Sequence, residues 1–310
     1  MLAFGAHRLD VVVTHLEGAS RLAPDDGVYA AASVYAKHVL EHGKSSVYVQ
    51  PEAFAAFIRS GGNQRLYRKT SAALAAAYAD HERASLLDIG VGDGAALLPA
   101  LNERIAHVIA VEPSPMLART SDALAAAGVP FEAVPLSIQQ FIARAPAISF
   151  DIAQATFALQ SLPPDERRQV WPWLRAHARR VLLVEFDVPS FAEPCSPQRV
   201  AHVLARYRLG VAEHASEPLV IQGFLMPVLF GYFDPTTART NYEQSRAEWQ
   251  LELQGAGFER VSSQLLDEYW WAPAYLLDAS PRPARAARAA AGPLQARARA
   301  PRRGGGRSRT

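Results

Sequence analysis

The stretch that decides the fold is "LLDIGVGDGAALL", residues 86–98. An apolar run typical of a buried strand leads into three closely spaced glycines, Gly90, Gly92 and Gly94, with Asp88 just before them. Glycines at such a turn let a bound molecule approach the backbone closely. The stretch therefore predicts a ligand-binding loop between a strand and a helix, with the helix over residues 94–105.

Strand-like and helix-like segments alternate after this loop. Short apolar runs occupy residues 85–90, 107–112, 131–136, 150–157 and 180–187, and helical patterns such as residues 116–129 lie between them. This alternation predicts an α/β fold with a doubly wound, mostly parallel sheet. Two last runs, residues 259–269 and 271–279, predict an antiparallel hairpin at the edge of a seven-stranded sheet.

The remaining segments suggest a division of the chain into five parts. Residues 1–80 are expected to form an N-terminal helical cap, 81–187 a Rossmann-like cofactor-binding half, and 188–239 a helical or irregular cap insertion. Residues 240–280 are expected to hold a closing helix, with a capping box of Thr240 and Glu243, and the edge hairpin. Residues 281–310 are rich in Arg, Pro, Gly and Ala, a composition that predicts a disordered tail.

Composition and charge exclude several classes of function. The formal net charge of +2 includes nine arginines that follow Asp278, and without them it falls to −7, which argues against a specific nucleic-acid partner. The single cysteine excludes an internal disulfide. The chain has no signal-peptide pattern and no apolar run of about 20 residues, so we expect a cytoplasmic protein without a membrane partner. The oligomeric state is left open, a homodimer included.

Two acidic residues narrow the choice of cofactor. Glu112 follows Gly94 by 18 residues, where an acid accepts hydrogen bonds from ribose hydroxyls in either a nicotinamide or an S-adenosylmethionine enzyme. Asp88 distinguishes between these two cofactors, because its carboxylate would repel the pyrophosphate of a nicotinamide cofactor but suits the ammonium group of S-adenosylmethionine. Asp88 could instead support the glycine loop, and the two roles do not exclude each other.

Four motifs in order, "LLDIGVGDG", "VIAVEPSPML", "FDIAQATFALQSLPP" and "RVLLVEFD", give the chain a resemblance to class I S-adenosylmethionine-dependent methyltransferases. The resemblance implies S-adenosyl-L-methionine as the cofactor, with the glycines at its methionine part, Glu112 at its ribose and Met116 at its adenine. The implied cofactor contacts are Tyr67, Asp88, Gly90, Gly92, Gly94, Glu112, Pro113, Met116, Ser137, Ile138, Ala155, Thr156 and Phe157. The family often has an acid where Ser137 stands, so the adenine contact there would come from a hydroxyl or from the backbone of Ile138.

The acceptor leaves a weaker trace in the sequence. Methyl transfer requires alignment and exclusion of water, with a base where the acceptor carries a proton. The candidate bases are Glu185, His202, Asp234 and Tyr232. The candidate substrate wall comes from the aromatic insertion and consists of Phe224, Met226, Phe230, Tyr232 and Phe233, although each of these could simply bury the insertion. The nine histidines show no paired spacing with acids, so no metal site is expected.

The sequence therefore favours a methyltransferase that modifies an O, N or C atom of a small aromatic or apolar molecule, in specialised metabolism. A methyltransferase for protein or RNA, a nicotinamide-dependent oxidoreductase and a non-catalytic cofactor-binding subunit are the alternatives.

Overall fold

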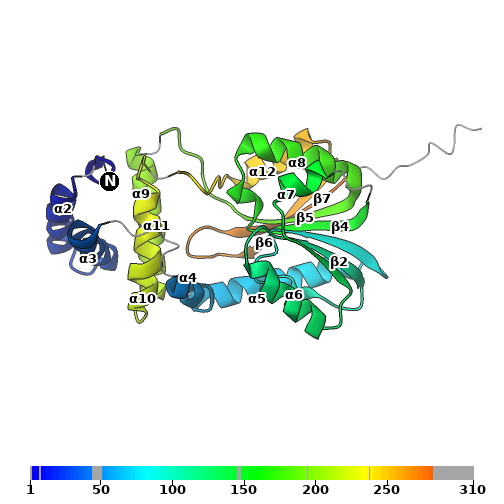
Figure 1. Ribbon diagram of the computed structural model, residues 1–310. Helices are drawn as coiled ribbons and strands as arrows, with labels where there is room; N and C mark the ends of the chain where they lie inside the picture. The colour runs from blue at the N-terminus through cyan, green and yellow to red at the C-terminus, as the bar shows by residue number, and fades with distance from the viewer. Residues whose placement is uncertain are drawn as a thin grey trace, which may run out of the picture.

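The computed structural model describes residues 2–6, 8–43, 51–144, 148–193, 195–236 and 238–281. These residues form a helical cap on one side and a sheet with helices on both faces on the other (Figure 1). The tail that the sequence predicts to be disordered lies outside the described residues, apart from Pro281.

The sheet has seven strands in the order β3-β2-β1-β4-β5-β7-β6. The strands are β1 (Ala84–Ile89), β2 (Ile105–Val111), β3 (Phe131–Val134), β4 (Phe150–Thr156), β5 (Ala178–Phe186), β6 (Arg260–Asp267) and β7 (Ala274–Ser280). β1 to β5 pair in parallel, whereas β7 pairs antiparallel with both β5 and β6. The predicted mostly parallel sheet with an antiparallel edge hairpin is confirmed.

Helices cover both faces of the sheet. One face carries α7 (Ile138–Ala143), α8 (Pro164–His177) and α12 (Arg246–Gly255), and the other carries α5 (Gly61–Tyr78) and α6 (Met116–Ala126) (Figure 1). Alternate strand residues feed the two cores: Leu87 packs under α8 and α12, and Leu86 packs against α5. This alternation is what a buried strand with two covered faces requires.

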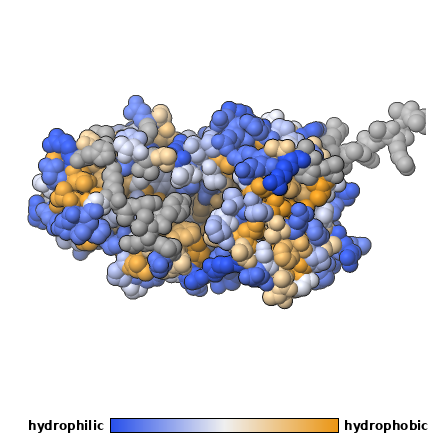
Figure 2. Space-filling view, viewed as in Figure 1, coloured by the Kyte–Doolittle hydropathy of each residue, from blue (hydrophilic) through white to orange (hydrophobic). Residues whose placement is uncertain are grey.

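The cap is built from two segments far apart in the sequence, the N-terminal helices and the segment between β5 and α12. Its helices are α1 (Leu2–Gly5), α2 (Leu9–Leu22), α3 (Gly27–His42), α4 (Pro51–Ile58), α9 (Pro197–Glu213), α10 (Pro218–Val220), the π-helical turn η4 (Ile221–Leu225) and α11 (Met226–Gly231). They share one apolar core. Figure 2 shows hydrophilic residues over much of the visible face with apolar patches between them, in keeping with these buried cores.

Two elements connect the cap to the sheet. α5 begins in the cap core with Leu66 and ends under the sheet with Tyr78. The loop between β6 and β7, Glu268–Pro273, is longer than the predicted turn and reaches the cap, where the Trp270 ring lies so close to Gly210 that a Cβ there would meet it at 2.8 Å. The hairpin is therefore fastened to the cap as well as to the sheet.

The helix predicted over residues 94–105 is wrong. Only a short 3-10 turn, η2 (Leu98–Ala100), forms in this range. Pro99 lies inside it, and proline has no N–H for a helical hydrogen bond and clashes with the preceding turn. A second 3-10 turn, η3 (Leu159–Ser161), follows β4.

The capping box predicted at Thr240 and Glu243 is also wrong. The box forms five residues later, where the Ser245 hydroxyl accepts from the Glu248 N–H and the Glu248 carboxylate accepts from the Ser245 N–H. The Glu243 carboxylate instead accepts hydrogen bonds from Tyr232 and Trp271. The closing end agrees with prediction, because α12 ends at Gly255.

Candidate functional site

The glycine loop has an open space at its centre. Gly90, Gly92 and Gly94 all have positive φ, at 68°, 57° and 77°. A Cβ on Gly90 would come within 2.5 Å of the Ala158 Cβ, and one on Gly94 within 2.9 Å of Leu98. A Cβ on Gly92 would meet no atom within 4 Å. The outer glycines are therefore required by packing, whereas the space at Gly92 is open.

Glu112 ties the end of β2 to this loop. Its carboxylate accepts from the N–H of Gly92 at 3.0 Å and from the N–H of Ser114 at 2.8 Å, and the side chain is buried. Pro113, between the two, is exposed where the chain turns toward α6. The Thr120 hydroxyl donates to the Gly92 carbonyl at 2.7 Å, so both polar groups of Gly92 are held. Each carboxylate oxygen of Glu112 retains acceptor capacity for a ligand hydroxyl.

Asp88 lies beneath the loop in the interior. Its carboxylate accepts from the Gln154 amide of β4 at 2.8 Å, and Gln154 in turn accepts from the Tyr78 hydroxyl of α5. Burial raises the pKa of Asp88 to about 7, the hydrogen bond from Gln154 opposes that rise, and the charge of Glu112 adds to it. Asp88 is thus a buried carboxyl that titrates near neutral pH.

The expected adenine contacts lie at the starts of two helices. Ser137 caps α7: its hydroxyl accepts from the Gln140 N–H at 3.2 Å, and its N–H donates to the Gln140 side chain at 3.0 Å. Because this hydroxyl is engaged in capping, the N–H of Ile138, which as the first helical residue has no partner within the helix, is the better donor for a ligand. Met116 opens α6 and is 38% exposed.

The end of β4 adjoins the glycine loop through the contact between Gly90 and Ala158. Ala155 is buried and Thr156 is half-buried at the last two positions of the strand. Phe157 follows with φ at 51°, an unfavourable value for a residue with a side chain, and its N–H donates to the Val184 carbonyl at 2.8 Å. The chain thus turns sharply directly after β4.

A row of aromatic rings starts at Phe157. Its ring meets Tyr67 of α5 edge-on at 6.2 Å and stacks on Phe186 of β5 at 4.5 Å, and Phe186 stacks on Tyr269 at 5.6 Å. Tyr67, Phe157 and Phe186 are half-buried. Burial raises the pKa of Tyr67 to about 12, so its hydroxyl stays protonated at neutral pH. The result is an apolar aromatic surface at the carboxyl ends of β4 and β5.

Two of the candidate bases, Glu185 and Asp234, are carboxylates that accept hydrogen bonds. Glu185 is buried at the end of β5 and accepts from the Gln160 N–H at 3.1 Å, and no described residue donates to its second oxygen. Burial raises the pKa of Glu185 to about 8. Asp234 accepts from the N–H of Thr236 at 3.0 Å and from its hydroxyl at 2.6 Å, the pattern of a side chain that closes a turn.

The other two candidate bases lie in the cap. His202 packs against Phe191 at 5.5 Å, and burial lowers its pKa. The Tyr232 hydroxyl donates to Glu243 at 2.9 Å, and its ring stacks on Trp271 at 5.2 Å. Burial raises the pKa of Tyr232 well above its ordinary value. Tyr232 therefore links the cap to the β6–β7 loop as a hydrogen-bond donor.

The five predicted wall residues lie in or against the cap core. Met226, Phe230 and Phe233 are at most 2% exposed, and Phe230 packs on Phe4 and Tyr35 at 4.6 and 5.1 Å. Phe224 and Tyr232 are half-buried. Burial of the insertion accounts for the first three, and contact of any of the five with an acceptor stays a prediction.

The structure adds residues that the sequence analysis missed. Glu243, whose pKa burial raises, accepts from Tyr232 and from the Trp271 indole at 2.8 Å. Phe186 and Gln154 are central to the aromatic row and to the Asp88 network, respectively. The aromatic cluster "YWW" in the β6–β7 loop was the one available signal, since such a cluster is unusual in an exposed turn.

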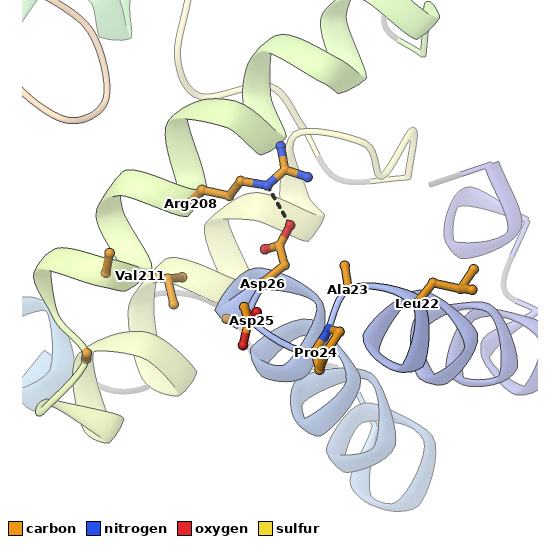
Figure 3. Close-up of a pocket in the computed structure, with 10 residues that line it drawn as sticks. Leu22, Ala23, Pro24, Asp25, Asp26, Arg208 and Val211 are labelled. Atoms are coloured by element: carbon orange, nitrogen blue, oxygen red, sulfur yellow. Dashed lines mark hydrogen bonds and ion pairs between the residues drawn. The ribbon is translucent and has the colours of Figure 1, made fainter.

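The other surfaces of the molecule show fewer features of a binding or catalytic site. A surface pocket of about 650 Å³ lies between the α2–α3 turn and α9, where Arg208 pairs with Asp26 at 2.6 Å. Figure 3 shows the residues that line it. Among the described residues, no group of three or more His, Cys, Asp and Glu side chains could hold a metal ion. Within the same ranges, every helix is too short or too polar to cross a bilayer.

Comparison with known proteins identifies the fold. No protein-family model matches the chain, and no curated protein sequence matches it. The structure of the pyocyanin biosynthetic protein PhzM matches with a TM-score of 0.51 and 16% identity, over 82% of this chain and 69% of that one. The strand order and this match confirm the predicted Rossmann-like α/β fold.

Other solved structures match more weakly. The Burkholderia thailandensis 1,6-didemethyltoxoflavin-N1-methyltransferase, with S-adenosylhomocysteine bound, gives a TM-score of 0.46 and 17% identity over 77% of this chain and 91% of that one. An O-methyltransferase family protein from the same organism gives a TM-score of 0.46 and 11% identity over 70% of this chain. This match covers 57% of the O-methyltransferase family protein. A separate match, to a putative O-methyltransferase from Nostoc punctiforme, covers 55% of that chain.

Proposed function

We propose that the protein transfers a methyl group from S-adenosyl-L-methionine to an O, N or C atom of a small aromatic or apolar molecule. The observation that carries the proposal is the open space at Gly92, bordered by the Glu112 carboxylate. A methionine chain fits against backbone that carries no side chain at Gly92, and a carboxylate next to it suits a ribose diol. The biosynthetic role named for PhzM agrees with a small-molecule acceptor.

The residues present fit this cofactor. Gly90, Gly92 and Gly94 would lie along its methionine part, Glu112 would accept from the ribose hydroxyls, and the N–H of Ile138 would donate to the adenine. When bound, the cofactor supplies an electrophilic methyl group on a sulfonium. The pyrophosphate of a nicotinamide cofactor would instead lie over the buried Asp88, which disfavours it.

The aromatic row supports an acceptor beside the cofactor's methyl end. Ala158 contacts the glycine loop, so the neighbouring ring of Phe157 stands next to the proposed cofactor site. Phe186 and Tyr67 extend the apolar surface away from the loop. Such a surface orients a planar acceptor and excludes water, which an in-line displacement needs.

A base is needed only where the acceptor holds its proton at neutral pH. Glu185 is the candidate base at the end of β5, where it accepts from Gln160 of the turn after β4, and its side chain lies on the opposite face of the sheet from that of Phe186. Its pKa of about 8 suits proton exchange near neutrality.

Calorimetric titration tests the cofactor assignment. S-adenosylhomocysteine should bind and NADH should not. Binding of NADH in place of S-adenosylhomocysteine would contradict the proposal.

A further inference from the structure

A threonine of α6 holds the centre of the glycine loop. Thr120 is fully buried, and its hydroxyl donates to the Gly92 carbonyl at 2.7 Å. A threonine or serine inside a helix usually donates to a carbonyl one turn back in the same helix, as the neighbouring Ser121 does to Leu117 at 2.8 Å. The Thr120 hydroxyl instead links α6 to the loop after β1, so it serves the loop rather than its own helix.

Gly92 is the residue of the loop that packing leaves unrestrained. It has no side chain, its φ is 57°, and a Cβ there would meet no atom within 4 Å. Two hydrogen bonds restrain it instead, one from its N–H to the Glu112 carboxylate at 3.0 Å and one from Thr120 to its carbonyl. They fix the orientation of the two peptide planes that meet at Gly92.

The orientation of the Gly92–Asp93 peptide determines where its N–H points. In a planar trans peptide the C=O and N–H groups point in opposite directions. Because the Gly92 carbonyl points toward Thr120, the Asp93 N–H points away from α6. No described residue accepts a hydrogen bond from this N–H. It is therefore an available donor next to the open space at Gly92.

The chemistry of the surroundings indicates what this donor could bind. The side chains next to the open space are acids: Glu112 accepts from the Gly92 N–H, and the Asp93 carboxylate turns back to accept from the Ala95 N–H at 3.2 Å. A ligand carboxylate placed here would depend on backbone donors, since these side chains offer none. The methionine part of S-adenosylmethionine carries one such carboxylate.

We propose that Thr120 is a positioning residue that, through the Gly92 carbonyl, orients the Asp93 N–H to donate to the carboxylate of the cofactor's methionine part. The inference rests on the proposed function. Thr120 itself contacts no ligand, and its contribution is to prevent the Gly92–Asp93 peptide from rotating. Loss of the hydroxyl should therefore weaken only ligands that carry the carboxylate.

Calorimetric titration with two ligands tests this selectivity. Thr120→Val keeps the shape of the side chain and removes its hydroxyl, so affinity for S-adenosylhomocysteine should fall about tenfold. Decarboxylated S-adenosylhomocysteine, which keeps the amine, should bind this variant and the wild type equally. Thr70→Val is the matched control, because Thr70 of α5 is also fully buried and no described residue bonds to its hydroxyl. It should leave both affinities unchanged.

Thr120→Ser separates the hydrogen bond from packing. Serine keeps the hydroxyl and loses a methyl group, so this variant should retain affinity for S-adenosylhomocysteine while its unfolding free energy falls in denaturant titrations. A packing role would give the reverse order, with lower affinity in Thr120→Ser than in Thr120→Val. Circular dichroism establishes that each variant is folded at the temperature of the titration.

Hydrogen exchange in the wild-type protein gives a test that needs no variant. Exchange of the Asp93 amide, followed by NMR, should slow when S-adenosylhomocysteine binds and should not slow with the decarboxylated ligand. Equal protection by both ligands would overturn the assignment of this N–H to the carboxylate.

Failure of this inference and failure of the proposed function give different results. A wild-type protein that does not bind S-adenosylhomocysteine would overturn the proposed function. Wild-type binding with unchanged affinity in a folded Thr120→Val variant would overturn this inference alone. An equal loss of affinity for both ligands in Thr120→Val would show that Thr120 supports the loop as a whole, and would overturn its role in orienting the Asp93 N–H.

Discussion

The open space at Gly92 gives the sharpest prediction, because the chain contains a matched control for it. Gly92 and Gly128 have similar positive φ values, 57° and 68°, and a Cβ on either would meet no atom within 4 Å. Replacement by alanine should therefore cost each variant about 1 kcal/mol of unfolding free energy from backbone strain alone. Only Gly92→Ala should lose S-adenosylhomocysteine affinity, by about 100-fold or roughly 2.7 kcal/mol, since its methyl group would occupy the ligand's space.

Chemical denaturation and calorimetry on both variants supply the two quantities. Gly90→Ala is a contrasting case: its Cβ would come within 2.5 Å of Ala158, so that variant should be destabilised well beyond the other two. Unchanged affinity in Gly92→Ala would refute the assignment of this space to a ligand. A much larger stability loss in Gly92→Ala than in Gly128→Ala would show that the space is needed by the protein itself.

Three further predictions concern single side chains. Glu112→Ala should weaken S-adenosylhomocysteine binding by about 1–3 kcal/mol, measured by calorimetry, because ribose hydroxyls lose a charged acceptor. Asp88→Asn should remove a pH dependence of stability: the folded pKa of about 7 exceeds the ordinary 3.8, so wild-type unfolding free energy should fall by about 2 kcal/mol more than the variant's between pH 5 and 7 in denaturant titrations. The opposite slope, or equal slopes, would contradict the buried state of this carboxyl. Phe230→Ala should cost about 3–5 kcal/mol of stability and leave S-adenosylhomocysteine affinity unchanged, because the ring is buried against Phe4; a stable variant with lost affinity would place Phe230 at the cofactor.

The fold could be predicted well because its signals are local. Each apolar run begins within three residues of an observed strand, and the glycine loop falls where the pattern changes from strand to turn. The two wrong predictions, the helix over residues 94–105 and the capping box, lie where two local sequence patterns compete. Residues 94–105 have helical spacing, but Pro99 limits them to one turn, and Ser245 with Glu248 shows the same capping pattern as Thr240 with Glu243.

The site was only half predictable, for a different reason. Glu112 was recognisable because its partner loop lies 18–22 residues away in a standard unit. Tyr78 and Gln154 are separated by 76 residues, and Phe186 comes from β5 whereas Tyr269 comes from the β6–β7 loop, so their contacts depend on strand order and helix placement rather than on any local pattern. Acceptor-side residues are the part that sequence periodicity does not specify.

The fastening of the β6–β7 loop to the cap also limits how this protein could be engineered. The cap cannot be transplanted onto another sheet as a cassette, because the bare surface of Gly210 is shaped by Trp270, a residue of the hairpin. The Arg206 guanidinium of the cap also donates to the carbonyl of Trp271 at 2.7 Å, so the two parts share backbone as well as side-chain contacts. Exchange of acceptor specificity by grafting would have to move α9 and the hairpin loop as one block.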